Sequence, residues 1–138
     1  MILVDTSLWI DILKDSRGSL VTSFRERVRK EIIVFCRFTQ LELLQGAKNE
    51  HEWRQLDEYL TSQYYLEANE KTWPTAARIF FELRRKGITV RSPIDCCIAT
   101  IAHESKALLL HKDKDFTRID SIFPFEQEFF NPNPPDHP

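Results

Sequence analysis

Short apolar runs alternate with amphipathic segments along the chain, and this alternation predicts its secondary structure. Runs of β-prone apolar residues predict strands at 2–4, 32–36, 64–66 and 107–110, with a last strand or edge at 122–125. Apolar residues at helical spacing predict helices at about 6–14, 20–30, 50–62 and 70–86. Because strands separated by helices are typical of α/β domains, we expect a mainly parallel central sheet.

Capping signals add two more helices. Thr39 and Glu42 have the spacing of a capping box, which predicts that a short helix opens at Thr39. Ser92 followed by Pro93 opens the clearest helix, because serine caps a helix and proline is well tolerated at its first position. Residues 111–116 contain two acids among other polar residues, and we expect a polar loop there.

Asp5 stands directly after the first predicted strand, and Thr6 or Ser7 is placed to cap the helix that follows. In open α/β sheets, ligands bind beside the carboxyl ends of the strands, where helix N-termini present amide N–H groups. Right-handed crossovers bring every such end to one edge of the sheet. The acids expected at this edge are Asp5, Glu42, Asp95 and Asp113, with Asp115 as the alternative to the last.

Helix capping and turn chemistry are enough to explain each of these acids alone. Glu42 and Asp95 each follow a Thr or Ser by three residues, and such a cap contributes about 1 kcal/mol. Four carboxylates within about 5–6 Å of one another are a different matter, because each close pair costs roughly 3 kcal/mol at an effective dielectric constant near 20. Acids gathered in this way must share protons or share a cation.

The chemistry of the candidate ligands favours a hard cation. Carboxylate oxygens with no accompanying His or Cys cluster suit Mg²⁺, or Mn²⁺ as the alternative, better than zinc. Cys36, Cys96 and Cys97 lack the spacing of a zinc site or a disulfide framework. A pocket holding one or two such ions can activate water and stabilise the displacement of a phosphodiester oxygen. The reaction implied is phosphodiester hydrolysis.

Length and composition indicate a single domain. The 138 residues are enough for one hydrophobic core, and we expect a domain at 1–130 and a proline-rich tail at 131–138. A net charge of −2 gives no overall attraction to nucleic acid or to a membrane surface, so any nucleic-acid site is a local patch. The odd cysteine count, with no signal peptide or membrane span, predicts a cytoplasmic protein.

Four segments in this order closely resemble one family. They are ILVDTSLWID at 2–11, TQLELLQG at 39–46, SPIDCCIA at 92–99 and LLHKDKDF at 109–116. Together they resemble the PIN-domain ribonucleases, and in particular the VapC-type toxins of bacterial toxin–antitoxin pairs. The resemblance covers roughly residues 1–125. It implies a three-layer α/β/α sandwich, Mg²⁺-dependent cleavage of RNA, a small antitoxin partner and a homodimer.

The resemblance also implies roles for individual residues. Asp5, Glu42 and Asp95 match the first three acids of the family, and Asp113 matches the fourth better than Asp115 does. Asp5, Asp95 and Asp113 would bind the metal ion, while Glu42 would bind it or orient the attacking water. The hydroxyl beside the first acid, from Thr6 or Ser7, would hold a ligand or the scissile phosphate.

Other functions fit the sequence less well. An aspartyl-phosphate phosphatase needs a second acid two residues after the first, and Ser7 occupies that position. A receiver domain has a different order of acids along the chain. The alternatives to the nuclease are a non-catalytic RNA- or protein-binding module and another metal-dependent phosphoesterase. None of the four acids is missing, which favours an active enzyme.

Overall fold

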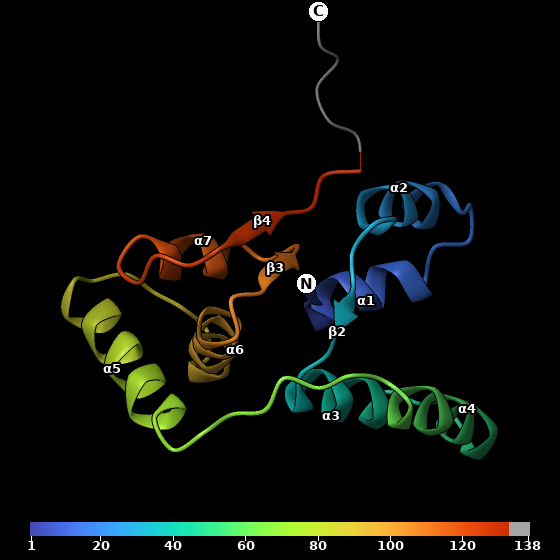
Figure 1. Cartoon of the computed structure of the whole chain (residues 1–138), viewed down its shortest axis with the longest axis horizontal. Helices are drawn as coiled ribbons and strands as arrows, with labels where there is room; N and C mark the ends of the chain where they lie inside the picture. Colours follow the sequence, from blue (N-terminus) through green and yellow to red (C-terminus); the bar gives the residue numbers. More distant parts are fainter. Residues whose placement is uncertain (133–138) are drawn as a thin grey trace, which may run out of the picture.

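A four-stranded parallel sheet forms the centre of the computed structural model, which describes residues 1–132 (Figure 1). The strands are β1 (Ile2–Val4), β2 (Ile33–Val34), β3 (Leu108–His111) and β4 (Gln127–Phe129). Their order across the sheet is β2-β1-β3-β4, so that strands far apart in sequence are neighbours. Because all are parallel, their carboxyl ends lie at one edge, as the sequence predicts. Of the predicted tail at 131–138, residues 133–138 lie outside the described residues.

Helices connect the strands and make up most of the described chain. They are α1 (Thr6–Leu13), α2 (Ser19–Val28), α3 (Arg37–Gln45), α4 (Glu50–Thr61), α5 (Thr72–Arg85), α6 (Pro93–Glu104) and α7 (Lys114–Asp120). Within residues 1–132, no helix is both long and apolar enough to cross a membrane.

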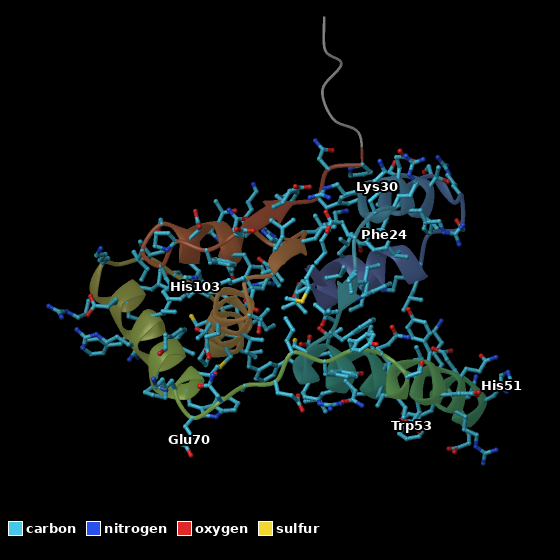
Figure 2. All side chains as sticks on the ribbon, viewed as in Figure 1. Phe24, Lys30, His51, Trp53, Glu70 and His103 are labelled. Carbon is cyan, nitrogen blue, oxygen red and sulfur yellow. The ribbon has the colours of Figure 1, made fainter. Side chains whose placement is uncertain are left out.

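Alternate side chains of the strands face opposite layers, which makes the predicted three-layer sandwich. Ile2 and Leu110 face α1 and α2, where Phe24 fills the space beneath α2 (Figure 2). Leu3 and Leu109 point the other way, into a larger cluster formed with α5, α6 and α7. Both faces of the central strands are therefore covered, which explains why these strands are continuous apolar runs.

The helices α3 and α4 pack together beyond β2 and carry a smaller core. Phe35, directly after β2, is fully buried there with Leu43 and Leu60. The indole of Trp9 from α1 stacks on the Phe35 ring, with 5.3 Å between ring centroids. This contact joins the α3–α4 pair to the main domain, and so sets the position of Glu42 on α3.

Several predicted boundaries are wrong. The run at 64–66 forms only a single parallel bridge, between Tyr65 and Phe35, and the last strand begins at Gln127 rather than at 122. The predicted opening of α3 at Thr39 is also wrong, because α3 begins at Arg37 and Thr39 lies inside it. The ends of these helices and strands depend on contacts with the edge of the sheet and with neighbouring helices, which local propensity does not report.

The cap of α6 is confirmed. Ser92 Oγ accepts a hydrogen bond of 3.1 Å from Ile94 N, and Pro93 occupies the first turn. The α5 helix ends before Gly87, whose φ of 72° lies in the left-handed region that glycine tolerates best. Together these features fix the turn from α5 into α6, and Asp95 lies in the first turn of α6.

We predict that Leu109→Ala destabilises the domain strongly. Leu109 is fully buried on the central strand β3, so truncation leaves a cavity and should lower the free energy of unfolding by about 2–5 kcal/mol. Urea unfolding followed by circular dichroism measures the change. Leu41→Ala, at a side chain that is 61% exposed, is the matched control and should change stability by about 0.5 kcal/mol or less.

Candidate active site

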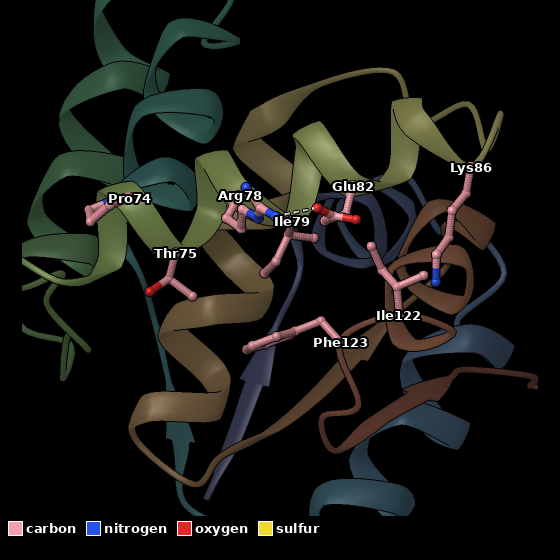
Figure 3. A pocket seen from close by; sticks show the side chains of 8 residues that line it. All are labelled: Pro74, Thr75, Arg78, Ile79, Glu82, Lys86, Ile122 and Phe123. Carbon is pink, nitrogen blue, oxygen red and sulfur yellow. Dashed lines mark ion pairs between the residues drawn. The ribbon is translucent and has the colours of Figure 1, made fainter.

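The four predicted acids line one cavity of about 380 Å³ at the carboxyl edge of the sheet. Asp5 follows β1, and Asp113 follows β3 by two residues. Glu42 lies on α3 and Asp95 on α6. A separate pocket between α5 and residues 122–123 contains none of these acids (Figure 3). Residues separated by more than a hundred positions in sequence are thus brought to one place.

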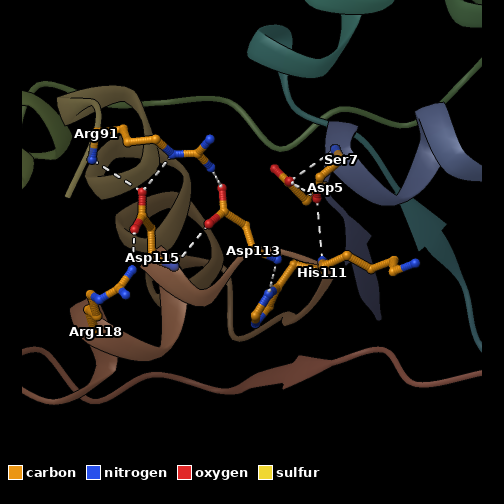
Figure 4. A network of polar contacts seen from close by, with 8 residues as sticks. Asp5, Ser7, Arg91, His111, Asp113, Asp115 and Arg118 are labelled. Carbon is orange, nitrogen blue, oxygen red and sulfur yellow. Dashed lines mark hydrogen bonds and ion pairs between the residues drawn. The ribbon is translucent and has the colours of Figure 1, made fainter.

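Asp5, rather than Thr6 or Ser7, caps α1. One oxygen of Asp5, Oδ2, accepts hydrogen bonds from Ser7 N at 3.1 Å and from Ser7 Oγ at 2.6 Å. The predicted cap is wrong because an acid at the end of β1 already supplies the acceptor that the first turn needs. Lys112 N donates to Ser7 Oγ at 3.3 Å, and so Ser7 joins the ends of β1 and β3 (Figure 4).

The hydroxyl of Thr6 contacts α3. It donates to Thr39 Oγ1 at 3.3 Å, and both side chains are buried. Thr39 lies one helical turn before Glu42, so this contact fixes the part of α3 that carries the acid. Thr39 is a supporting residue that the sequence presented only as a helix cap.

Asp113 caps α7, where the sequence predicts only a polar loop. Its Oδ1 accepts from Asp115 N at 2.9 Å, which makes this segment helical. The backbone N–H of Asp113 donates to His111 Nδ1 at 3.1 Å, and the other ring nitrogen lies 2.7 Å from Gln127 Oε1. The imidazole is fully buried, and burial lowers its pKa. His111 is therefore a neutral residue that supports Asp113. The sequence does not show this role, because the neighbours of His111 in the chain are polar and predict a loop.

Asp115 is buried beside the cavity and is paired with two arginines. Its Oδ2 accepts from Arg91 N at 3.1 Å and from Arg91 Nε at 3.2 Å, while its Oδ1 accepts from Arg118 at 2.7 Å (Figure 4). Burial raises its pKa, but these hydrogen bonds outweigh that effect and leave the pKa below its ordinary value. Of the two acids considered for the fourth position, Asp113 lines the cavity with the other three.

Comparison with known proteins identifies the family. The model of the PIN domain matches residues 2–122. The chain belongs to the PIN-domain family. Ribonuclease VapC11 of Mycobacterium tuberculosis is 31% identical over 125 residues, which covers 88% of this chain and 93% of that relative. The resemblance carried by the four sequence segments is thereby confirmed.

Solved structures agree with this assignment. VapBC-1 of nontypeable Haemophilus influenzae superposes with a TM-score of 0.75 at 26% identity, covering 93% of this chain and 97% of that one. VapBC2 of Rickettsia felis, bound to a DNA fragment from its promoter, gives a TM-score of 0.74 at 19% identity. That match covers 95% of this chain and all of the other, and it supports the fold alone.

The acidic cavity of this PIN domain has an unbalanced negative charge. Burial, together with the charges of Asp5, Asp113 and Asp115, raises the pKa of Asp95 to about 7. Burial and the charge of Asp5 raise the pKa of Glu42, and burial raises the pKa of Asp5 itself. Arg91 is the one cationic side chain among the described residues that line this cavity.

A divalent metal ion fits this set of oxygen donors. Asp95, Asp113 and Asp115 each offer a carboxylate oxygen, and these atoms lie within 4.8 Å of one another. A hard divalent cation prefers such ligands, and it would relieve the repulsion that, together with burial, raises the pKa of Asp95. The residues present therefore suit the metal dependence that is general among PIN-domain nucleases.

We predict that Asp95→Asn stabilises the metal-free PIN domain at alkaline pH. The folded pKa of about 7 lies above the ordinary value of 3.8, so ionising Asp95 makes the wild type lose stability as the pH rises between these values. Asparagine removes this loss. Solvent screening limits the gain to about 1 kcal/mol, or about 2–4 °C in Tm.

Thermal unfolding in EDTA measures this effect. The Tm difference between variant and wild type should be present at pH 8 and absent near pH 4. Glu58→Gln, at an exposed carboxyl on α4, is the control and should show no such pH dependence. A variant less stable than wild type at pH 8 would contradict the repulsion described above.

Proposed function

We propose that this protein is a Mg²⁺-dependent endoribonuclease that acts as the toxin of a toxin–antitoxin pair. The observation that carries the proposal is the convergence of Asp5, Glu42, Asp95 and Asp113 on one cavity in a PIN-domain chain. The relative VapC11, which is named a ribonuclease, supports RNA as the substrate. Mn²⁺ is the alternative ion, because it accepts the same oxygen ligands.

The positions of the acids suggest different roles for them. Asp5, Asp95 and Asp113, which line the cavity, would hold the metal ion, and Glu42 on α3 would orient the attacking water or complete the ligand set. A bound divalent ion supplies Lewis acidity toward the phosphate and lowers the pKa of water. Asp115 is held by both Arg91 and Arg118 and does not line the acidic cavity, whereas Asp113 does, and so we assign the fourth position to Asp113.

The two hydroxyls beside Asp5 support the site from different sides. Ser7 donates to Asp5 Oδ2 and fixes the direction in which the other oxygen is free to bind. Thr6 holds α3 through Thr39 and so sets the distance from Glu42 to the other acids. We therefore propose positioning roles for both hydroxyls, rather than contact with the scissile phosphate.

A protein partner has a suitable surface next to the acids. A hollow lined by Ile10, Leu13, Leu43 and Leu56 borders the acidic cavity through Glu42. Leu13 is 62% exposed, and an exposed apolar side chain beside a hollow suits an apolar partner segment. We propose that an antitoxin binds here. A homodimer remains a prediction from the family resemblance. A cytoplasmic location remains a prediction from the cysteines, which are free thiols as in a reducing compartment.

The proposal is tested by cleavage of total RNA with purified, antitoxin-free protein. Cleavage should require Mg²⁺ or Mn²⁺, and sequencing of the cut ends should show defined positions. Asp5→Asn should lower the rate by about 100-fold or more, because a metal ligand is lost, whereas Glu58→Gln should cut like wild type. RNA binding without metal-dependent cleavage would favour the non-catalytic module instead.

Metal binding should depend on pH through Asp95. Binding requires the ionised carboxylate, and its pKa is raised to about 7, so Mn²⁺ affinity should rise by roughly tenfold per pH unit below 7 and level off above it. Calorimetric titration between pH 5.5 and 8.5 measures the affinity. Repeating it in buffers of different ionisation enthalpy counts the released protons. An affinity independent of pH would exclude Asp95 as a ligand.

A further inference from the structure

A second hollow, of about 620 Å³, borders the acidic cavity on the side away from α4. We call it the basic hollow, because Arg91, Lys112, Lys114 and Arg118 line it. Asp113 and Asp115 are the two acids of its lining, so its formal charge is positive in a chain of net charge −2. Arg91 and Asp113 line both cavities and therefore mark the junction between them.

Arg91 is held by hydrogen bonds, yet its side chain is largely exposed to solvent. Its backbone N–H and its Nε both donate to the buried carboxylate of Asp115, and its terminal NH2 group pairs with Asp113 (Figure 4). The side chain is nevertheless 75% exposed. Its guanidinium is thus held in place while most of its surface faces the solvent, an arrangement suited to binding an anion from outside.

The other cations extend this positive surface along the hollow. Arg118 is held by the second oxygen of Asp115, and Lys112 Nζ lies 2.9 Å from Asp11 Oδ2. Lys114 forms no ion pair within residues 1–132. Phe129 on β4, which is 43% exposed, adds an aromatic surface to the same hollow.

We propose that the basic hollow binds the RNA strand on one side of the cleaved bond, with Arg91 contacting the phosphate next to the acidic cavity. This inference rests on the proposed ribonuclease function. Cations would bind successive phosphates, and Phe129 would stack on an unpaired base, which is how proteins hold single-stranded RNA. An acidic protein segment would use the cations but would leave the exposed aromatic ring without a role.

Arg91 and a metal ion compete for Asp113, and this competition gives the proposal an independent test. The NH2 group of Arg91 pairs with Asp113 Oδ2, an oxygen of a proposed metal ligand. Removing the guanidinium therefore leaves Asp113 with its full negative charge for binding a metal ion. It also removes one positive group that could bind RNA. Arg91→Gln should bind Mn²⁺ more tightly and RNA more weakly, whereas a misfolded variant would lose both.

RNA binding is measured by fluorescence anisotropy, with a labelled single-stranded RNA 12-mer in EDTA so that binding is separated from cleavage. We expect the Kd to rise about 5–20-fold for Arg91→Gln and about 2–5-fold for Lys114→Gln, because each loses a phosphate contact. A plot of the logarithm of the RNA association constant against the logarithm of the salt concentration has a negative slope. The magnitude of this slope should decrease by about 0.7 for each variant. Phe129→Leu should weaken binding about 5-fold or more through lost stacking, without changing that slope.

Two matched controls lie elsewhere on the surface. Lys30→Gln changes an exposed cation just after α2, and Arg54→Gln changes an exposed arginine on α4. Both should bind RNA within twofold of wild type. Equal losses in the controls and in Arg91→Gln would overturn the assignment, because the attraction would then be a property of the whole surface.

The outcomes separate this inference from the proposed function. If wild type cleaves RNA with Mg²⁺ while Arg91→Gln and Lys114→Gln bind RNA as wild type does, the basic hollow is not the RNA site and the nuclease stands. If wild type neither cleaves nor binds RNA, both proposals fail. If Arg91→Gln binds Mn²⁺ no more tightly than wild type, the competition for Asp113 is refuted.

Discussion

Carboxylates of like charge are held close together where β1 and β3 end, and no described group fully neutralises them. The parallel sheet causes this, because it delivers Asp5 and Asp113 to neighbouring positions at the same edge. The crossovers then place α3 and α6 so that Glu42 and Asp95 face the same cavity. Burial and the resulting repulsion together raise the pKa of Asp95, and a divalent cation would relieve the repulsion.

Two residues that support these acids leave their negative charge uncompensated. Ser7 supports Asp5, and the neutral imidazole of His111 supports the backbone of Asp113. Both are uncharged, so they fix position without supplying positive charge. Asp115 differs, because Arg91 and Arg118 neutralise it and keep its pKa low. Arg91 also pairs with Asp113, and so it links the neutralised Asp115 to the acids of the cavity.

The surroundings of the acidic cavity are asymmetric. One neighbouring hollow is largely apolar and is bounded by α1, α3 and α4, while the other is lined by cations from α7 and from the segments before α6 and after β3. Under our proposals, a protein partner occupies the first and RNA the second, and both reach the same acids. A partner seated over Glu42 would then control access to the site without taking the place of the RNA phosphates.

The sequence by itself determined most of the order of strands and helices, the parallel sheet and the four acids that meet at its edge. These features follow from local patterns. An apolar run followed by an acid, for example, indicates a buried strand and the point where it ends. The sequence missed α7, and its strand at 64–66 is only a bridge. Only the tertiary structure decided how the acids are supported. Thr39 lies inside α3 rather than at its start, and His111 is buried beneath a segment that resembles a loop. Such contacts join residues distant in sequence, so no local periodicity reports them. The different surroundings of Asp113 and Asp115 depend on Arg91 and Arg118 for the same reason, because spacing cannot show which carboxylate an arginine will hold.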